Sequence, residues 1–284
     1  MHAPGQGWAV VVPVKGGPLA KSRLRLPREA RATLADAFAR DTVDALAAGM
    51  PGARVLVVTS DVAVAGWVLA AGHAVVADPG SGLDAAVAAG VAAALEVGAS
   101  RVAVVLGDHP ALRADEVRAA VAAAGEHPAS VLADADDGGT ALLTLPAAGA
   151  GSVRTAFGAG SAAAHERLGH VRLELDLPGL RVDVDDAASL AAAVRLGLGP
   201  HSREALAHAS LPGVQATIHR IEPDGSGSAL LDDGLEVVVP PGAAVASGLR
   251  HLRVGQRVSV ELDEAGRVAT RVWVVGIGPG EDIR

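Results

Sequence analysis

Apolar and polar positions alternate in two different ways along this chain of 284 residues. As far as about Leu206, short apolar runs that resemble buried strands alternate with alanine-rich segments that have helical spacing. The predicted strands are 8–14, 54–59, 74–77 and 101–107, and the predicted helices are 28–49, 61–71, 83–97 and 113–124. This alternation favours right-handed βαβ units and a mostly parallel sheet. After Ser130 shorter strands are expected near 129–133, 140–145 and 171–175, and a last helix near 186–197.

A second domain is predicted beyond residue 212. The alanine-rich helices end there, and five short alternating runs follow at 214–219, 228–231, 235–239, 257–262 and 268–275, with turn signals between them. Five strands in so short a segment fit a small closed barrel such as an OB-fold. We therefore expect a first domain at 1–205, a linker at 206–212, a barrel at 213–276 and a tail at 277–284.

Composition narrows the functional classes. Half of the residues are apolar but only 2% are aromatic, so the core must consist of Ala, Val and Leu. A net charge of −8 gives no general attraction to nucleic acid or to an acidic membrane surface. The absence of cysteine excludes disulfides and thiolate metal sites. Without a membrane-length apolar run or a signal-peptide pattern, the expected location is cytoplasmic.

The first predicted strand leads into a cationic loop. It carries Lys15, Lys21 and Arg23 together with two glycines, Gly16 and Gly17. Ligands bind outside the carboxyl ends of strands in α/β sheets, and a cationic loop without bulky side chains suits a polyphosphate. The spacing is not that of a P-loop, so a plain solvated loop remains the alternative.

Carboxylates follow two other predicted strands. Asp108 comes just past a buried strand and could ligate Mg²⁺ or cap a turn. Asp183 and Asp185 would share one face of a short strand, where they repel each other unless a cation lies between them. For Asp186 we expect the N-cap of the following helix.

Two further segments combine glycine with hydroxyl side chains. Thr140 follows Gly138 and Gly139 and could donate to a phosphate or carboxylate. Ser161 ends a glycine-containing loop, where it either binds an anion or simply caps a helix. His165 is interpreted as a surface or packed histidine.

Taken in order, these motifs resemble the CofC/FbiD family of phosphoenolpyruvate or 2-phospho-L-lactate guanylyltransferases, which act in biosynthesis of the deazaflavin coenzyme. The resemblance spans roughly residues 8–197 and rests on segments 13–15, 20–24, 82–84, 107–110, 138–140, 157–165 and 183–186. It implies an α/β fold with a Rossmann-like mixed sheet of the nucleotidyltransferase (glycosyltransferase-A) type. It also implies GTP and a small phosphorylated carboxylic acid as substrates and Mg²⁺ as cofactor.

Carried over residue by residue, the resemblance implies a role for each motif. Contacts to the triphosphate would come from Lys15, Lys21 and Arg23, with Lys21 and Arg23 catalytic; Gly82 and Asp84 would bind the nucleotide; Asp108, Asp183 and Asp185 would hold Mg²⁺; and Thr140, Gly158 and Ser161 would bind the acceptor. Two positions depart from the family pattern, which usually has Asn at Asp84 and Leu at His109.

The C-terminal segment resembles a cold-shock domain at 231–239 and 247–258. Cold-shock domains stack bases on exposed aromatic side chains, whereas this segment has a single aromatic residue, Trp273. We therefore expect a structural or protein-interaction role rather than nucleic-acid binding.

Two rival functions stay open: a nucleotidyltransferase for another phosphorylated acceptor, and a non-catalytic RNA-binding protein that uses the barrel. The sequence also leaves open a homodimer, a contact with another enzyme of the pathway, and the choice among phosphoenolpyruvate, 2-phospho-L-lactate and 3-phosphoglycerate.

Overall fold

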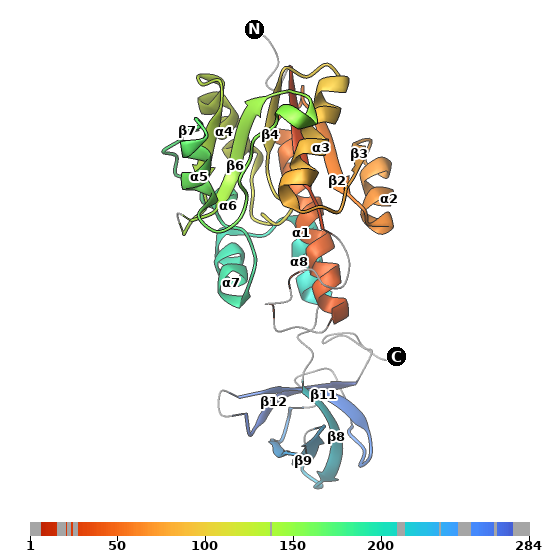
Figure 1. Ribbon diagram of the computed structural model, residues 1–284. Helices are drawn as coiled ribbons and strands as arrows, with labels where there is room; N and C mark the ends of the chain where they lie inside the picture. Colours follow the sequence, from red (N-terminus) through yellow and green to blue (C-terminus); the bar gives the residue numbers. More distant parts are fainter. Residues whose placement is uncertain are drawn as a thin grey trace. The chain divides into compact units, whose positions relative to one another are not determined.

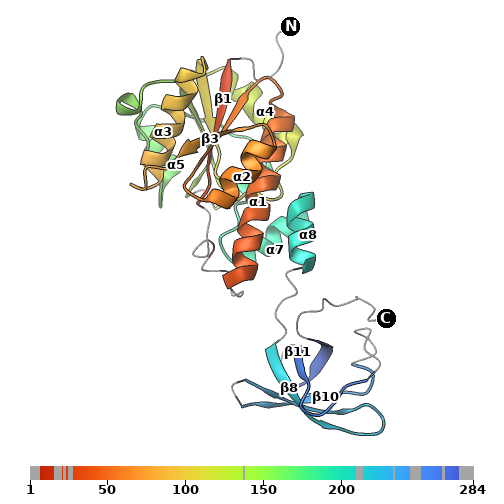
Figure 2. The ribbon, with the colours of Figure 1, turned by 90° about the vertical axis from the view of Figure 1, so that its right-hand side faces the viewer.

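The chain divides into two compact units, Met1–Ala205 and Leu206–Arg284, each of which is described by itself. The structure is a computed structural model (Figures 1 and 2). It describes residues 7–15, 21, 24, 28–136, 138–208, 214–232, 234–243, 251–263 and 266–274.

A seven-stranded sheet in the order β3-β2-β1-β4-β6-β5-β7 forms the centre of the first unit. Its strands are β1 (Trp8–Pro13), β2 (Arg54–Thr59), β3 (Ala74–Ala77), β4 (Arg101–Val104), β5 (Ser130–Ala133), β6 (Thr140–Pro146) and β7 (Val171–Arg172). Strand β6 is antiparallel to both of its neighbours, β4 and β5, whereas the other pairings are parallel. The expected mixed sheet is thus confirmed.

Helices cover both faces of this sheet (Figures 1 and 2). Among the described residues the helices are α1 (Arg28–Gly49), α2 (Val62–Ala70), α3 (Leu83–Glu96), α4 (Ala114–Gly125), α5 (Ser161–Arg167), α6 (Pro178–Arg181), α7 (Ala187–Leu196) and α8 (Pro200–His208), with a 3₁₀ turn at Ala150–Ser152. Side chains of α1, α2 and α4 pack into the core on one face, and those of α3 and α5 pack into the core on the other.

The continuous apolar run of β1 follows from this three-layer arrangement. Val10 and Val12 point into one core and Ala9 and Val11 into the other, and all four are fully buried. A strand that is covered on both faces needs apolar side chains at every position rather than at every second one. Small residues bring the layers close together: a Cβ on Gly90 of α3 would lie 2.4 Å from Cγ1 of Val11.

Some predicted strands are shorter in the structure. The strand expected at 101–107 ends at Val104, and the one expected at 171–175 contains only Val171 and Arg172. The short strand expected around Asp183 and Asp185 is wrong. Helix α6 ends at Arg181 and Asp186 already caps α7, and residues 182–185 between them belong to no strand, because the N–H of Val184 donates to the carbonyl of Asp108 in a loop.

The second unit is a curled five-stranded antiparallel sheet in the order β10-β9-β8-β11-β12. Its strands are β8 (Val214–Ile221), β9 (Gly227–Leu231), β10 (Glu236–Val239), β11 (Arg257–Leu262) and β12 (Ala269–Val274). The two edge strands, β10 and β12, approach each other. Val238 of β10 forms a parallel bridge with Val268, which precedes β12, and the N–H of Val238 donates to the carbonyl of Arg267 at 2.9 Å. This closure fits the small OB-like barrel that the sequence predicts. No helix among the described residues is long and apolar enough to span a bilayer.

Candidate active site

Polar residues gather at the edge of the first unit's sheet where the parallel strands end. Lys15 lies two residues beyond the end of β1, and Asp108 lies four residues beyond the end of β4. Because β6 runs in the opposite direction, its first residue, Thr140, lies at the same edge. The reversal of a single strand thus brings residues from two distant parts of the sequence to one side of the sheet.

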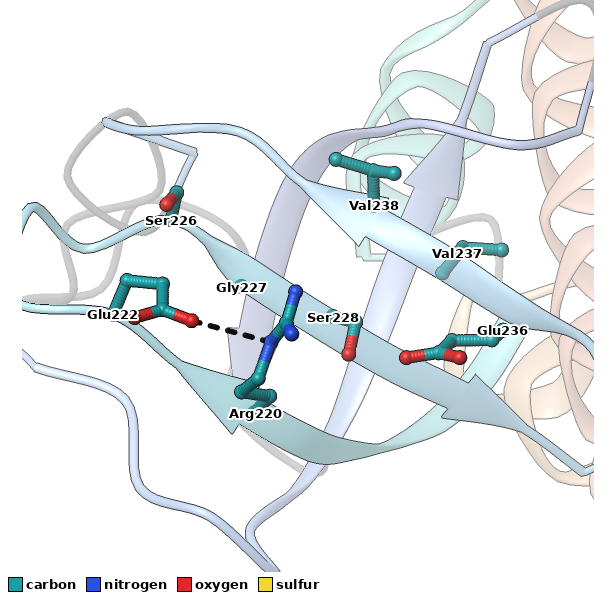
Figure 3. Close-up of a pocket in the computed structure, with 8 residues that line it drawn as sticks. All are labelled: Arg220, Glu222, Ser226, Gly227, Ser228, Glu236, Val237 and Val238. Atoms are coloured by element: carbon teal, nitrogen blue, oxygen red, sulfur yellow. Dashed lines mark ion pairs between the residues drawn. The ribbon is translucent and has the colours of Figure 1, made fainter.

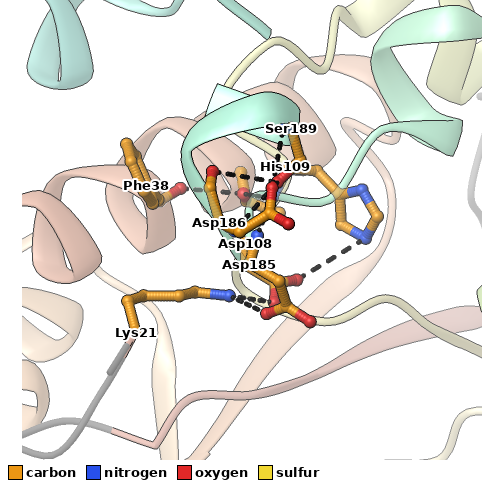
Figure 4. Close-up of polar contacts among 8 residues, drawn as sticks. Lys21, Phe38, Asp108, His109, Asp185, Asp186 and Ser189 are labelled. Atoms are coloured by element: carbon orange, nitrogen blue, oxygen red, sulfur yellow. Dashed lines mark hydrogen bonds and ion pairs between the residues drawn. The ribbon is translucent and has the colours of Figure 1, made fainter. Parts of the chain in front are cut away.

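Lys21 reaches into a group of carboxylates at this edge (Figure 4). Its Nζ lies 2.6 Å from Oδ2 of Asp108 and 2.9 Å from Oδ1 of Asp185. The side chains of Lys21 and Asp108 are only 12% and 16% exposed, so water screens their attraction weakly. Lys21 also has a backbone φ of 54°, in the left-handed region that residues other than glycine seldom adopt and that is often found at functional sites.

Three carboxylates come together beside Lys21. Asp108, Asp183 and Asp185 each offer an oxygen, and these oxygens all lie within 4.8 Å of one another. Val184 is buried between the two later aspartates, and its N–H donates to the backbone carbonyl of Asp108 at 3.0 Å. This backbone hydrogen bond holds the irregular segment against the Asp108 loop, so that the side chains on either side of Val184 face Asp108.

The start of α7 fixes the other end of this segment. The predicted N-cap is confirmed, since Asp186 accepts hydrogen bonds from the N–H groups of Ala188 and Ser189. The hydroxyl of Ser189 in turn accepts from the backbone N–H groups of Asp185 and Asp186, both at 3.0 Å. The exposed carboxylate of Asp185 is therefore carried by a backbone that is hydrogen-bonded to the first turn of α7.

The charges in this cluster are not balanced. Burial opposes the charged forms of both Lys21 and Asp108, but their mutual attraction raises the pKa of Lys21 and holds the pKa of Asp108 below its usual value. Burial, together with the negative charges of Asp108 and Asp185, raises the pKa of Asp183. One ammonium group faces three carboxylates, and a further cation would stabilise the ionised form of Asp183.

A hard divalent cation fits this group of side chains. Carboxylate oxygens are the ligands that Mg²⁺ prefers. Oδ1 of Asp108 is buried and has no hydrogen-bond partner among the described residues, which leaves it free to coordinate. The residues for which the sequence predicts metal ligation are thus the ones that the fold brings together.

His109 lies directly behind Asp108. Its ring is 1% exposed, and its Nε2 is 3.8 Å from Oδ1 of Asp108, too far for a hydrogen bond. Its backbone N–H donates to the hydroxyl of Thr42 at 3.1 Å, and that hydroxyl donates to the carbonyl of Phe38 at 2.8 Å. The loop that carries Asp108 is thereby tied to α1. The sequence singled out His109 as a departure from the family pattern but did not predict that it is buried.

A second polar cluster contains the residues expected to bind the acceptor. The hydroxyl of Thr140 lies 2.8 Å from that of Ser161 and 3.0 Å from Nδ1 of His165. His165 is fully buried, as the packed interpretation predicts. Gly160, with a φ of 71°, is the N-cap of α5, so the interpretation of Ser161 as a simple N-cap is wrong. Gly158 precedes this cap with a φ of 136°, a conformation available to glycine.

The predicted nucleotide-binding residues that the structure describes lie after β1 and at the start of α3. Gly82 precedes α3 with a φ of 98° and is its N-cap. Oδ1 of Asp84 accepts from the hydroxyl of Thr155 at 2.6 Å and from the N–H of Phe157 at 3.0 Å, so this carboxylate anchors the segment before α5. Lys15 is exposed at the end of β1. Arg23 lies outside the described residues.

The barrel has a pocket of its own (Figure 3). Its lining consists of Arg220, Glu222, Ser226, Gly227, Ser228, Glu236, Val237 and Val238. Nε of Arg220 is 3.3 Å from Oε1 of Glu222, so the basic side chain in this pocket already has an acidic partner. This mixed charge does not form the basic surface that a nucleic acid needs. The cold-shock resemblance stays a prediction.

Fold and site together define a nucleotidyltransferase: a mixed α/β sheet that carries acidic and lysine side chains at its carboxyl edge. Comparison with known proteins gives the family. A phosphoenolpyruvate guanylyltransferase of Salinispora arenicola is 48% identical over 202 residues, which is 69% of this chain and 92% of the relative. A protein of the same name from Streptomyces coelicolor is 42% identical, covering 72% of this chain and 99% of its own length. The chain belongs to the phosphoenolpyruvate guanylyltransferase family.

Two further comparisons found similar proteins. The family model described as "Uncharacterized protein conserved in bacteria (DUF2064)" matches residues 42–157. A solved structure of a nucleotide-diphospho-sugar transferase from Desulfovibrio desulfuricans superimposes with a TM-score of 0.48 at 19% identity, covering 59% of this chain and 80% of that protein.

Proposed function

We propose that this protein transfers GMP from GTP to the phosphate group of phosphoenolpyruvate and releases pyrophosphate, as a step in biosynthesis of the deazaflavin coenzyme. The observation that carries the proposal is the position of Lys21 between Asp108 and Asp185, with Asp183 in the same cluster. This arrangement offers both a cation for phosphate oxygens and carboxylates for a metal ion. The names of the relatives supply the nucleotide and the acceptor.

The reaction needs alignment more than acid–base chemistry. A phosphate oxygen of the acceptor attacks the α-phosphorus of GTP, the bond from that phosphorus to the bridging oxygen breaks, and pyrophosphate leaves with the bonding electrons. The attacking phosphate is already ionised near neutral pH, so no general base is required. The protein has to hold the anionic acceptor next to the anionic triphosphate of GTP. It also has to stabilise the negative charge that develops during the transfer.

The ammonium group of Lys21 is suited to stabilise the transferring phosphoryl group. The raised pKa of Lys21 keeps it charged at neutral pH. We assign Lys15 and Arg23 to the same triphosphate, and Gly82 and Asp84 to the nucleoside portion.

We assign Asp108, Asp183 and Asp185 to Mg²⁺. When bound, this ion would neutralise phosphate charge and link the nucleotide to the protein. Its positive charge would also oppose the burial and the repulsion from Asp108 and Asp185 that together raise the pKa of Asp183. The phosphorylated acid is assigned to Thr140, Gly158 and Ser161, which lie at the same edge of the sheet.

A direct assay tests this function. The purified full chain is incubated with GTP, MgCl₂ and phosphoenolpyruvate; pyrophosphate release is followed, and the product is identified by mass spectrometry. We expect release with GTP and little with CTP or UTP. Parallel reactions with 2-phospho-L-lactate and 3-phosphoglycerate rank the acceptors. Absence of pyrophosphate with all three acids would contradict the proposal, and a preference for CTP or UTP would contradict its guanylyl part.

A further inference from the structure

His165 is a buried titratable residue for which the reaction above has no use. It is fully buried in α5, and two rings hold its orientation: that of Phe157, with a centroid 5.0 Å away, and that of His170, at 5.6 Å. Both contacts are edge-on, at interplanar angles of 70° and 64°. Both ring nitrogens of His165 have hydrogen-bond partners, one in the backbone and one in a side chain.

The backbone partner determines which nitrogen carries the proton. The N–H of Ala156 lies 3.0 Å from Nε2 of His165. A backbone N–H can only donate, so Nε2 must be the unprotonated acceptor. The ring is neutral at physiological pH, because burial lowers the pKa of His165 to about 4. The single ring proton therefore resides on Nδ1.

The proton on Nδ1 orders the two hydroxyl groups beyond it. Nδ1 lies 3.0 Å from Oγ1 of Thr140, so the ring donates to that oxygen. The hydroxyl proton of Thr140 is then directed away from His165, and the acceptor within reach among the described residues is Oγ of Ser161, at 2.8 Å. Ser161 is 2% exposed, and its proton has no acceptor in this chain of hydrogen bonds, so it is left to donate to an anion that binds against the start of α5.

We propose that His165 is a positioning residue: held as the Nδ1–H tautomer by Ala156, it polarises Thr140 so that Ser161 presents its hydroxyl proton to the anionic acceptor substrate. This inference rests on the proposed function, in which Thr140 and Ser161 bind a phosphorylated acid. Its chemistry is favourable because a preoriented donor needs no rearrangement when the anion arrives. The opposite polarity would point a hydroxyl lone pair at the anion.

Kinetics of matched variants test the inference. His165→Gln can still accept from the N–H of Ala156 but places no donor at Thr140. We expect its KM for phosphoenolpyruvate to rise about ten- to a hundredfold, the usual effect of losing an oriented buried hydrogen bond, with an unchanged KM for GTP. His165→Asn places an amide N–H near the position of Nδ1 and should restore most of the affinity for the acceptor.

His201→Gln is the matched control. It makes the same substitution at a histidine whose Nε2 lies 3.1 Å from Oδ2 of Asp44, outside the hydrogen bonds of Thr140 and Ser161. We expect this variant to keep the wild-type KM for phosphoenolpyruvate. An unchanged KM in His165→Gln, or an equal rise in the KM for GTP, would overturn the inference.

The tautomer itself is measured without any turnover. Long-range ¹H–¹⁵N spectra of the full chain at pH 7 should show His165 neutral and protonated on Nδ1. A ring protonated on Nε2, or on both nitrogens, would overturn the inference even in an active enzyme. Conversely, a chain that shows the expected tautomer but transfers no GMP contradicts the proposed function and leaves the hydrogen-bond order standing.

Discussion

Replacement of Asp108 by Asn separates catalysis from stability in this site. Asn keeps the size of the side chain and an oxygen that can accept from Lys21, but it removes one negative charge. At 2.6 Å the gross attraction between Lys21 and Asp108 is roughly 6 kcal/mol for an effective dielectric constant of 20, most of which offsets the cost of burying the two charges. The same substitution relieves repulsion on Asp183. We therefore expect a loss of only about 1–2 kcal/mol in the free energy of unfolding.

Activity should respond much more strongly than stability. Loss of a residue that only hydrogen-bonds to a metal ligand commonly lowers metal affinity or activity about ten- to a hundredfold. Loss of a carboxylate that is itself a ligand should therefore lower kcat/KM at least about a hundredfold, which corresponds to roughly 2.7 kcal/mol. Pyrophosphate release over a range of MgCl₂ concentrations measures the loss of activity. Urea unfolding measures the loss of stability. Asp115→Asn serves as the control, because Asp115 is 63% exposed in the first turn of α4. A variant at Asp108 that keeps more than about a tenth of wild-type kcat/KM with an ordinary magnesium dependence would refute the metal assignment.

Three further predictions concern stability and are measured by urea unfolding. Gly90→Ala should lower the free energy of unfolding by about 1–2 kcal/mol, because its Cβ would lie 2.4 Å from Val11. Gly66→Ala has open space around its Cβ and should raise the free energy of unfolding by about 0.5–1 kcal/mol. Equal effects of the two substitutions would refute the packing argument. Asp41→Ala removes a carboxylate that accepts from two N–H groups at the start of α8, at 3.0 and 2.8 Å, and should cost about 1–2 kcal/mol; no change would show that α8 needs no cap. His165, with its pKa lowered to about 4, takes up a proton on unfolding, so stability should fall by about 2 kcal/mol from pH 7 to pH 5, and His165→Gln should lose that part of the slope.

The sequence predicts best those structural features that depend on one helix or one strand alone. The long helices and the first four strands follow from apolar periodicity and lie within a few residues of their predicted bounds. The N-cap at Asp186 was predictable because capping is local. The convergence of Asp108 with Asp183 and Asp185 came from the family resemblance, since a separation of more than seventy residues leaves no local signal.

Features that depend on tertiary contacts were missed. The segment around Val184 reads as a strand by alternation, but its backbone bonds to the Asp108 loop instead of to a neighbouring strand. The hydrogen-bond chain through His165 could not be predicted either, because Ala156 contributes only its backbone N–H, which every residue except proline has. Similarly, the contact of Asp84 with Thr155 and Phe157 joins the start of α3 to a loop that is remote in sequence.

The reversed direction of β6 has an evolutionary consequence. Lys21 and Asp108 belong to the part of the chain that precedes β5, whereas Thr140 and Ser161 belong to the hairpin and helix that come after it. Under the proposed assignment, the residues that choose the acceptor lie within one stretch, 140–161, between the earlier nucleotide-binding residues and the later pair Asp183 and Asp185. Mutations confined to that stretch could exchange one small phosphorylated acid for another while the residues assigned to the nucleotide and to Mg²⁺ stay intact.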